Sequence, residues 1–141
     1  MVAVIFEAIP GEGKKDEYFA IAEKLRPELN KIQGFISIER FQSVAHPGKV
    51  LSLSFWEDEE SIAQWRNVEM HRNAQAKGRR SVFSDYRLRV AQVVRDYGMK
   101  DREQAPADSK HIHGRTAHYS LSTLTRINLS LFDTITNKSN K

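Results

Sequence analysis

FWEDEESIAQWR, residues 55–66, is the most informative stretch of this sequence. Phe55 and Trp56 end a run in which apolar and small polar residues alternate, as is typical of a strand. The acidic residues that follow suit the first turn of a helix, where the helix dipole favours negative charge. Ile62 and Trp65 then recur at helical spacing. The stretch therefore predicts a strand, a turn and an amphipathic helix.

The segments on either side extend this pattern to one α+β unit, βαββαβ, over residues 1–98. Gly and Pro turns separate the segments, and Pro27 is expected to kink or restart the first helix. The second helix, opened by Asp58 or Glu59, is expected to break near residues 66–68. The pattern predicts strands at 2–9, 35–41, 50–56 and 86–94, with helices from about Lys14 to residue 33, from 58 or 59 to about 66, and from 69 to about 84.

The predicted strands are apolar on both sides, although helices can cover only one face of such a sheet. Small proteins avoid leaving a large apolar patch in water. We therefore expect a homodimer in which the second copy covers the other face. Trp56 is assigned to the side of its strand nearer this dimer seam, and Phe55 to the helix side.

The sequence changes character after Gly98. Residues 99–118 are polar and show no apolar period, which predicts a linker or disorder. Residues 119–132 alternate as a strand does, and could add to a sheet edge, although an unstructured tail is slightly favoured. We therefore divide the chain into a folded domain, 1–98, and a polar, flexible tail, 99–141.

Composition excludes several classes of function. The 141 residues contain no cysteine, so disulfides, thiolate metal sites and cysteine nucleophiles are excluded. The net charge is +4. Residues 1–98 hold 15 basic and 14 acidic residues, so the excess lies in the tail, and no nucleic-acid surface is expected. No run is long enough to cross a membrane, and no signal peptide is evident, so a cytoplasmic protein is expected.

The order of elements, together with Phe55-Trp56, Ser61, Trp65, His71 and the closing strand before Gly98, resembles the antibiotic biosynthesis monooxygenase (ABM) domain family. The resemblance covers residues 2–98. It implies a ferredoxin-like sandwich with an antiparallel sheet, paired with a second subunit as a dimeric α/β barrel. It also implies one of two activities: cofactor-free oxygenation of a quinol-like or polycyclic aromatic substrate by O2, or oxidative haem cleavage.

The haem-degrading branch of the family is the weaker match. Its axial His would fall near Gln75, and its first-strand Asn near Phe6. Of the residues that this branch needs, only Trp65 is present. His71 lies one helical turn before the axial position, so it could replace that ligand only if the helix shifted.

His71 is the candidate catalytic residue. It shares a predicted helical stripe with Ala74, Gly78 and Val82, facing the sheet. A neutral imidazole there could take a proton from a phenolic substrate as a general base. The alternative is a half-buried His bonded to a backbone carbonyl. No other potential ligand stands at metal-binding spacing from His71, so neither a metal nor a cofactor is expected.

The candidate substrate-binding residues are aromatic walls and polar contacts: Trp65, Phe55 and Phe83 as walls, and Asn67 and Arg72 as contacts. Each has a plainer interpretation, as core packing for the aromatic residues and as solvent exposure for Arg72. Two functions follow. The first is a cofactor-independent monooxygenase, and the second is a non-catalytic dimeric module that binds a small ligand or responds to stress.

Overall fold

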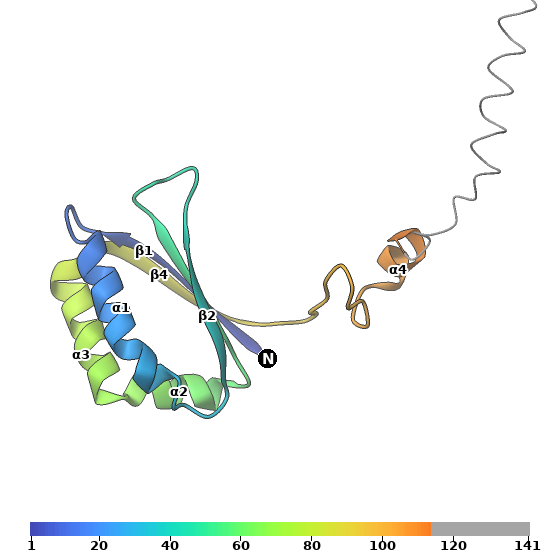
Figure 1. Ribbon diagram of the computed structural model, residues 1–141, viewed down its shortest axis with the longest axis horizontal. Coiled ribbons are helices and arrows are strands. Elements are labelled where there is room, and N and C mark those ends of the chain that lie inside the picture. The colour runs from blue at the N-terminus through green and yellow to red at the C-terminus, as the bar shows by residue number, and fades with distance from the viewer. Residues whose placement is uncertain (114–141) are drawn as a thin grey trace, which may run out of the picture. The chain divides into compact units, whose positions relative to one another are not determined.

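The computed structural model describes residues 1–113. The elements appear in the order β1 (Val2–Pro10), α1 (Lys15–Leu29), β2 (Phe35–Gln42), β3 (Val50–Trp56), α2 (Glu59–Asn67), α3 (Glu69–Lys77), the π-helix η1 (Gly78–Val82), β4 (Phe83–Gln92) and α4 (Ala107–His113) (Figure 1). Residues 1–94 form one compact unit, and the chain from Arg95 belongs to a second. Each unit is described by itself.

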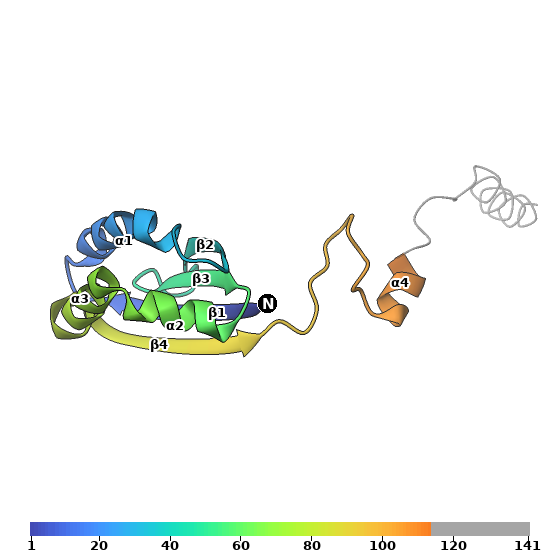
Figure 2. The same ribbon diagram turned by 90° about the horizontal axis from the view of Figure 1, so that it is seen from below.

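The four strands of the first unit form one antiparallel sheet in the order β2-β3-β1-β4. The central strand β1 pairs Val4 with Ser54 of β3 and with Val90 of β4. Helices α1, α2 and α3 lie on one face of the sheet (Figure 2). This arrangement confirms the predicted ferredoxin-like α+β fold.

The helix-covered face of β3 forms much of the core. Val50, Ser52, Ser54 and Trp56 are all buried, whereas the residues between them are only partly buried. Trp56 is 2% exposed. Its assignment to the dimer seam is therefore wrong. Because successive strand residues point to opposite faces, placing Trp56 in the core directs Phe55 to the other face.

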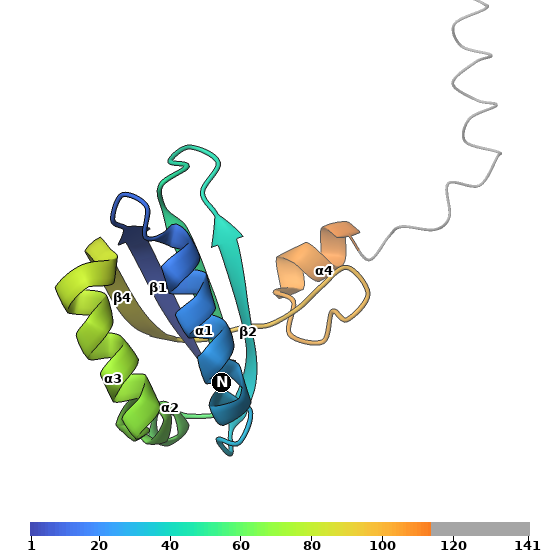
Figure 3. The ribbon, with the colours of Figure 1, turned by 60° about the vertical axis from the view of Figure 1, so that its left-hand side comes forward.

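The second face of the sheet carries apolar side chains without a covering helix. Figure 3 shows α1 and α3 side by side on the opposite face, and no helix of residues 1–94 covers this one. Ile5, Leu51, Leu53 and Phe55 are each partly exposed. At one end of this face Glu7 pairs with Lys49 at 3.2 Å and with Arg89. The prediction that the strands are apolar on both sides holds for most of β1 and for β3, but it is wrong for β4, which places Arg87 opposite Glu7 and Arg89 opposite Ile5 on this face.

Helices α1, α2 and α3 begin within one residue of the positions that the sequence predicted. Asp58 caps α2, because its Oδ1 accepts hydrogen bonds from the Ser61 backbone N–H at 2.8 Å and the Ser61 hydroxyl at 2.7 Å. The hydrogen bond from the Ser61 backbone N–H is the main cause that lowers the Asp58 pKa. The predicted break in this helical region is confirmed at Val68, whose backbone is extended. Helix α1, by contrast, runs unbroken through Pro27 to Leu29.

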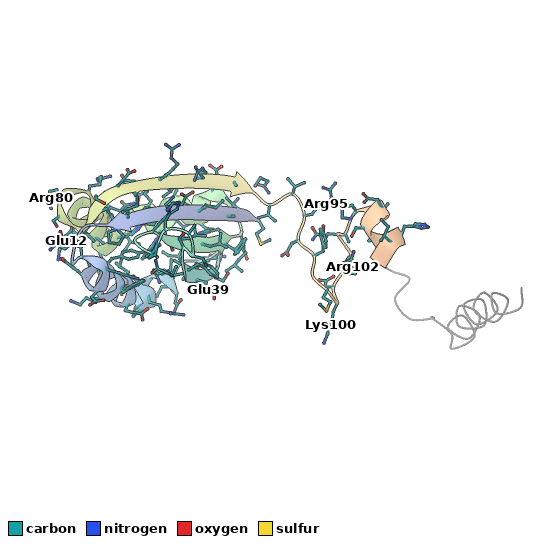
Figure 4. The ribbon with its side chains drawn as sticks, turned by 90° about the horizontal axis from the view of Figure 1, so that it is seen from above. Glu12, Glu39, Arg80, Arg95, Lys100 and Arg102 are labelled. Atoms are coloured by element: carbon teal, nitrogen blue, oxygen red, sulfur yellow. The ribbon has the colours of Figure 1, made fainter. Side chains whose placement is uncertain are left out.

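The last strand begins three residues earlier than predicted, at Phe83 rather than Tyr86. The π-helix η1 ends the helical segment at Val82, whose carbonyl accepts a hydrogen bond from the Gly11 backbone N–H at 2.8 Å. This contact joins the β1–α1 turn to η1, and Figure 4 shows Glu12 and Arg80 at the same end of the unit. Local sequence patterns could not predict this hydrogen bond, because it joins residues that are far apart in the sequence.

Replacing Gly34 with alanine is expected to destabilise the fold strongly. Its φ is +83°, and an added Cβ would lie 2.1 Å from the Ser61 hydroxyl oxygen. Gly34→Ala should therefore strain the backbone and displace Ser61 from Asp58, which costs about 3 kcal/mol in the free energy of unfolding. Urea denaturation checks this. Gly48→Ala is the matched control, because nothing lies within 4 Å of its added Cβ. Equal stability of the two variants would contradict the argument.

The second unit contains more structure than expected. Residues 107–113 form α4, although the sequence showed no apolar period there. Arg102 holds this segment together, since its guanidinium donates to the Ser109 hydroxyl at 2.7 Å and lies over the Tyr97 ring. The strand-like stretch 119–132 and His118 lie outside the described residues.

Candidate active site

A cavity of about 270 Å³ lies between the helices and the sheet of the first unit. Most of its wall is apolar. The helices contribute Tyr18, Leu25, Trp65 and Ala74, and the strands contribute Val4, Phe6, Trp56 and Phe83, among others. The cavity is slightly smaller than the usual range for small-molecule sites, so it suits a compact ligand.

The cavity opens toward the edge strand β4. Leu88 and Val90 line it, yet 50% of Leu88 and 45% of Val90 remain exposed. Residues that line the cavity and are also exposed to solvent lie at its opening. A ligand could therefore enter along β4.

His71 lies in the cavity wall, stacked on Trp65. The ring centroids are 4.3 Å apart and the planes differ by 17°. The Nδ1 of His71 is 3.0 Å from the backbone carbonyl oxygen of Trp65. A carbonyl oxygen only accepts hydrogen bonds, so this contact places the proton on Nδ1. In the neutral ring, Nε2 is then the atom that can take a proton.

Burial keeps this imidazole neutral. It lowers the pKa of His71 from its ordinary value of 6.5, and the hydrogen bond to Trp65 only partly opposes the shift. A neutral imidazole with Nδ1 protonated is the state that a general base needs at pH 7. The plainer interpretation, a half-buried His bonded to a carbonyl, describes the same geometry and leaves Nε2 available.

The break between α2 and α3 creates this arrangement. Val68 is extended, with φ −60° and ψ 128°, so α2 ends at Asn67 and α3 begins at Glu69. The Trp65 carbonyl, near the end of α2, accepts from the Val68 N–H at 3.1 Å as well as from His71. Carbonyls at helix ends lack intrahelical partners, and His71 satisfies this one.

The pH dependence of stability provides a test of the buried neutral state. Because the folded pKa lies below the unfolded one, the unfolded chain binds more protons, and stability falls as pH decreases below about 6.5. The wild type should lose stability relative to His71→Gln by up to about 1.4 kcal/mol per pH unit in that window. Urea denaturation between pH 8 and pH 5 measures this. A constant difference would mean that His71 is not desolvated.

Two of the predicted wall residues line the cavity, Trp65 and Phe83. Phe83 packs edge-on against Phe6 at 5.5 Å and against Tyr18 at 5.3 Å between ring centroids. Its ring lies over Gly78, where an added Cβ would come within 2.8 Å. Gly78 therefore makes room for the aromatic wall. The predicted stripe of His71, Ala74, Gly78 and Val82 lines the same cavity.

Three predicted contacts do not line it. Phe55 points to the opposite face, in register with Ala3 and Ser37. Asn67 and Arg72 are exposed and hydrogen-bond to each other. The assignment of Phe55 to the cavity wall is wrong, because β3 alternates in the other phase. Asn67 and Arg72, predicted as polar contacts, lie outside the cavity lining because they face outward at the α2–α3 junction.

Sequence reasoning missed several polar residues of the wall, above all Ser52, Ser54 and Arg40. The Ser54 hydroxyl accepts a hydrogen bond from the Trp56 indole N–H at 2.9 Å. One signal was present in the sequence: two serines at alternate positions of an otherwise apolar strand. Such residues are expected where a strand faces a polar partner or a ligand.

Other kinds of site find no support in the described part of the chain. In residues 1–113 no group of three or more His, Cys, Asp or Glu residues could hold a metal ion. None of the helices described there is long and apolar enough to span a membrane.

The fold and the site define the first unit as a small α+β domain with an apolar cavity between its helices and its sheet. Residues 1–77 match the family model described as antibiotic biosynthesis monooxygenase. The chain therefore belongs to the antibiotic biosynthesis monooxygenase family, which confirms the resemblance.

Relatives and solved structures agree with this assignment. Over 94 residues, 67% of this chain, it is 53% identical to a Pyricularia oryzae protein named jasmonate monooxygenase ABM; the match covers 44% of that protein, so the chain spans less than half its length. It is 30% identical to Bacillus subtilis YqjZ over 66% of this chain and 79% of that protein. The structure of Rv0793 from Mycobacterium tuberculosis shares the fold, with a TM-score of 0.62 and 14% identity over 69% of this chain and 98% of that one.

Proposed function

We propose that this protein is a cofactor-independent monooxygenase that uses O2 to oxidise a compact, electron-rich substrate of the quinol or anthrone type. The observation that carries the proposal is His71, a neutral imidazole in the wall of an apolar cavity, with Nδ1 held by the Trp65 carbonyl. Membership in the family supports the reaction class.

The proposed reaction needs a base and a dry cavity. The Nε2 of His71 takes a proton from the substrate, leaving an anion that is rich in electrons. The anion passes one electron to O2, and the resulting radical pair combines to form a C–O bond and a peroxide anion, which takes the proton back from the Nε2 of His71. For an anthrone the peroxide then loses water, so a CH2 group and O2 become a C=O group and H2O. An apolar wall excludes water from the reactive anion.

Oxygen uptake by the purified protein tests the proposal. Hydroquinones, naphthalene-1,4-diol and anthrones are supplied under air, and uptake above the rate of spontaneous oxidation is recorded. Saturable uptake with at least one of these substrates is the expected result. Uptake no faster than autoxidation with every substrate, together with binding of the same compounds, would favour the non-catalytic ligand-binding alternative.

Jasmonate is a second candidate substrate. The Pyricularia oryzae relative is named for it, and that relative is 53% identical over 94 residues, 67% of this chain. Jasmonate therefore joins the panel in the same oxygen-uptake assay. Uptake with jasmonate alone would replace the aromatic substrate class with this one.

Haem cleavage is the less favoured alternative. Gln75 and Phe6, which occupy the positions of the haem branch's axial His and first-strand Asn, both line the cavity. Neither side chain is a haem ligand of that kind. A haem titration should therefore give no Soret shift at micromolar protein. A Soret shift that His71→Ala abolishes would favour haem cleavage over cofactor-independent oxygenation.

We also propose that the protein acts as a homodimer joined through the open face of the sheet. The support is physical: Ile5, Leu53 and Phe55 lie on a face that no helix of residues 1–94 covers. A second copy would remove this apolar surface from water. The dimer would also brace the sheet that forms one wall of the cavity.

A further inference from the structure

We propose that the substrate carries a carboxylate, and that Arg40 binds it end-on through its two terminal nitrogens. The inference rests on the proposed function and names the substrate class more closely. It arises from a feature that the proposed reaction does not use, the charge of the cavity wall.

The cavity wall is cationic. Its lining residues include Arg40 and Arg66 and contain no Asp or Glu. His71 adds no negative charge in either protonation state. Inside an apolar cavity a charge interacts more strongly than in water, so this wall favours an anion over a neutral molecule of the same shape.

Arg40 is held in place but not paired. It lies on β2, in register with Ser52 of β3. Its Nε donates to the Tyr18 hydroxyl at 3.3 Å, and its guanidinium carbon lies 5.9 Å from the centroid of the Tyr18 ring. Tyr18 is itself 8% exposed, so it is a fixed support.

The two terminal nitrogens of Arg40 have no protein partner in the described residues 1–113, where the only hydrogen bond of its side chain is the one through Nε and no ion pair reaches it. A guanidinium presents these two nitrogens as a planar fork that matches the two oxygens of a carboxylate. The open end of Arg40 is therefore the strongest anion-binding group in the cavity.

Arg66 is the weaker candidate. It is exposed and lies in the last turn of α2, where a positive charge already offsets the helix dipole. Its position thus has an explanation without a ligand. The contacts of Arg40 with Tyr18 explain its Nε and the face of its guanidinium, but they do not engage its two terminal nitrogens.

The two functional groups come from different walls. Arg40 belongs to the edge strand β2, whereas His71 belongs to α3. A substrate that pairs its carboxylate with Arg40 and gives a proton to His71 must place an apolar body between them. The cavity of about 270 Å³ suits a compact apolar body.

Binding of a non-oxidisable probe tests the inference apart from catalysis. Calorimetric titration compares 2-naphthoate with its neutral amide, 2-naphthamide, on the wild-type protein. The carboxylate is expected to bind at least about tenfold more tightly, as a charge-assisted pair contributes more than a neutral hydrogen bond. Equal affinities, or tighter binding of the amide, would overturn the proposal. This comparison needs no variant.

Arg40→Met then locates the anion site. It should weaken 2-naphthoate binding by roughly 10- to 100-fold and leave 2-naphthamide within twofold. Arg79→Met is the matched control, since Arg79 is exposed and does not line the cavity. Arg40→Lys, which keeps the charge and loses the fork, should give an intermediate affinity. Equal weakening of both probes in Arg40→Met and Arg40→Lys would show a structural role only.

Failure here is separable from failure of the proposed function. If naphthalene-1,4-diol supports oxygen uptake while 2-naphthoate and 2-naphthamide bind equally, the oxygenase proposal stands and the carboxylate proposal fails. If 2-naphthoate binds through Arg40 and no substrate supports uptake, the cavity is an anion-selective binding site without the proposed reaction.

Discussion

His71→Ala is expected to lower kcat/KM for oxygen uptake by about 10²- to 10⁴-fold, the range for removing a general base. The variant loses the imidazole that accepts the proton in the proposed reaction. In that imidazole Nδ1 donates to the Trp65 carbonyl, so Nε2 is the nitrogen that can accept a proton from the substrate. Stopped-flow or electrode measurement of oxygen uptake checks this. His46→Ala removes an exposed His from the turn between β2 and β3, outside the cavity, and should leave the rate unchanged.

The pH profile separates a base from a packing residue. Burial lowers the His71 pKa from 6.5, so the wild-type rate should hold at pH 6.5 and fall only at lower pH, as the ring gains its proton. In His71→Ala the deficit should shrink once the pH exceeds the pKa of the substrate, because the substrate then enters already ionised. A deficit that is the same at every pH would assign His71 to structure alone.

Leu53→Arg is expected to raise the dissociation constant of the proposed dimer by about 100-fold or more. Leu53 lies on the uncovered face of β3, in register with Ile5 of β1 and Glu39 of β2. An arginine there would bring its charge, with that of its neighbour Glu39, into the interface, where the loss of hydration costs several kcal/mol. Sedimentation velocity across a concentration series measures the change.

Val44→Arg is the control for this variant. Val44 is 99% exposed in the turn between β2 and β3, so a charge there should leave association unchanged. A wild-type protein that is folded and monomeric at low micromolar concentration would overturn the dimer proposal. Dissociation of both variants to the same extent would place the interface elsewhere.

The βαββαβ order could be predicted because its signals are local. Acidic residues after Trp56 mark the start of α2, and the Asp58 side chain does cap it. The prediction of a break before Glu69 also held, and this break brings His71 onto Trp65. Strand ends were less predictable, since β4 starts at Phe83 because of a hydrogen bond to the distant Gly11.

The assignments failed where both faces of a strand are apolar. Phe55 and Trp56 are adjacent and equally hydrophobic, so the sequence could not say which faces the helices. The Ser52, Ser54 and Trp56 set lies under the helices, and Phe55 faces away. Asn67 of α2 and Arg72 of α3 failed for a related reason, because the rotation of each helix about its axis depends on packing and not on helix propensity.

The amino-acid sequence by itself determined the α+β class, the order of elements and the family, because helix caps, turns and apolar periods act over a few residues. It also indicated His71 as the candidate base. Only the tertiary structure decided which side chains share the cavity, and it brought Arg40 of β2 and Tyr18 of α1 into the lining of the same cavity as His71 of α3. Strand order and register set these neighbours, and they follow from the free energy of packing over the whole sheet.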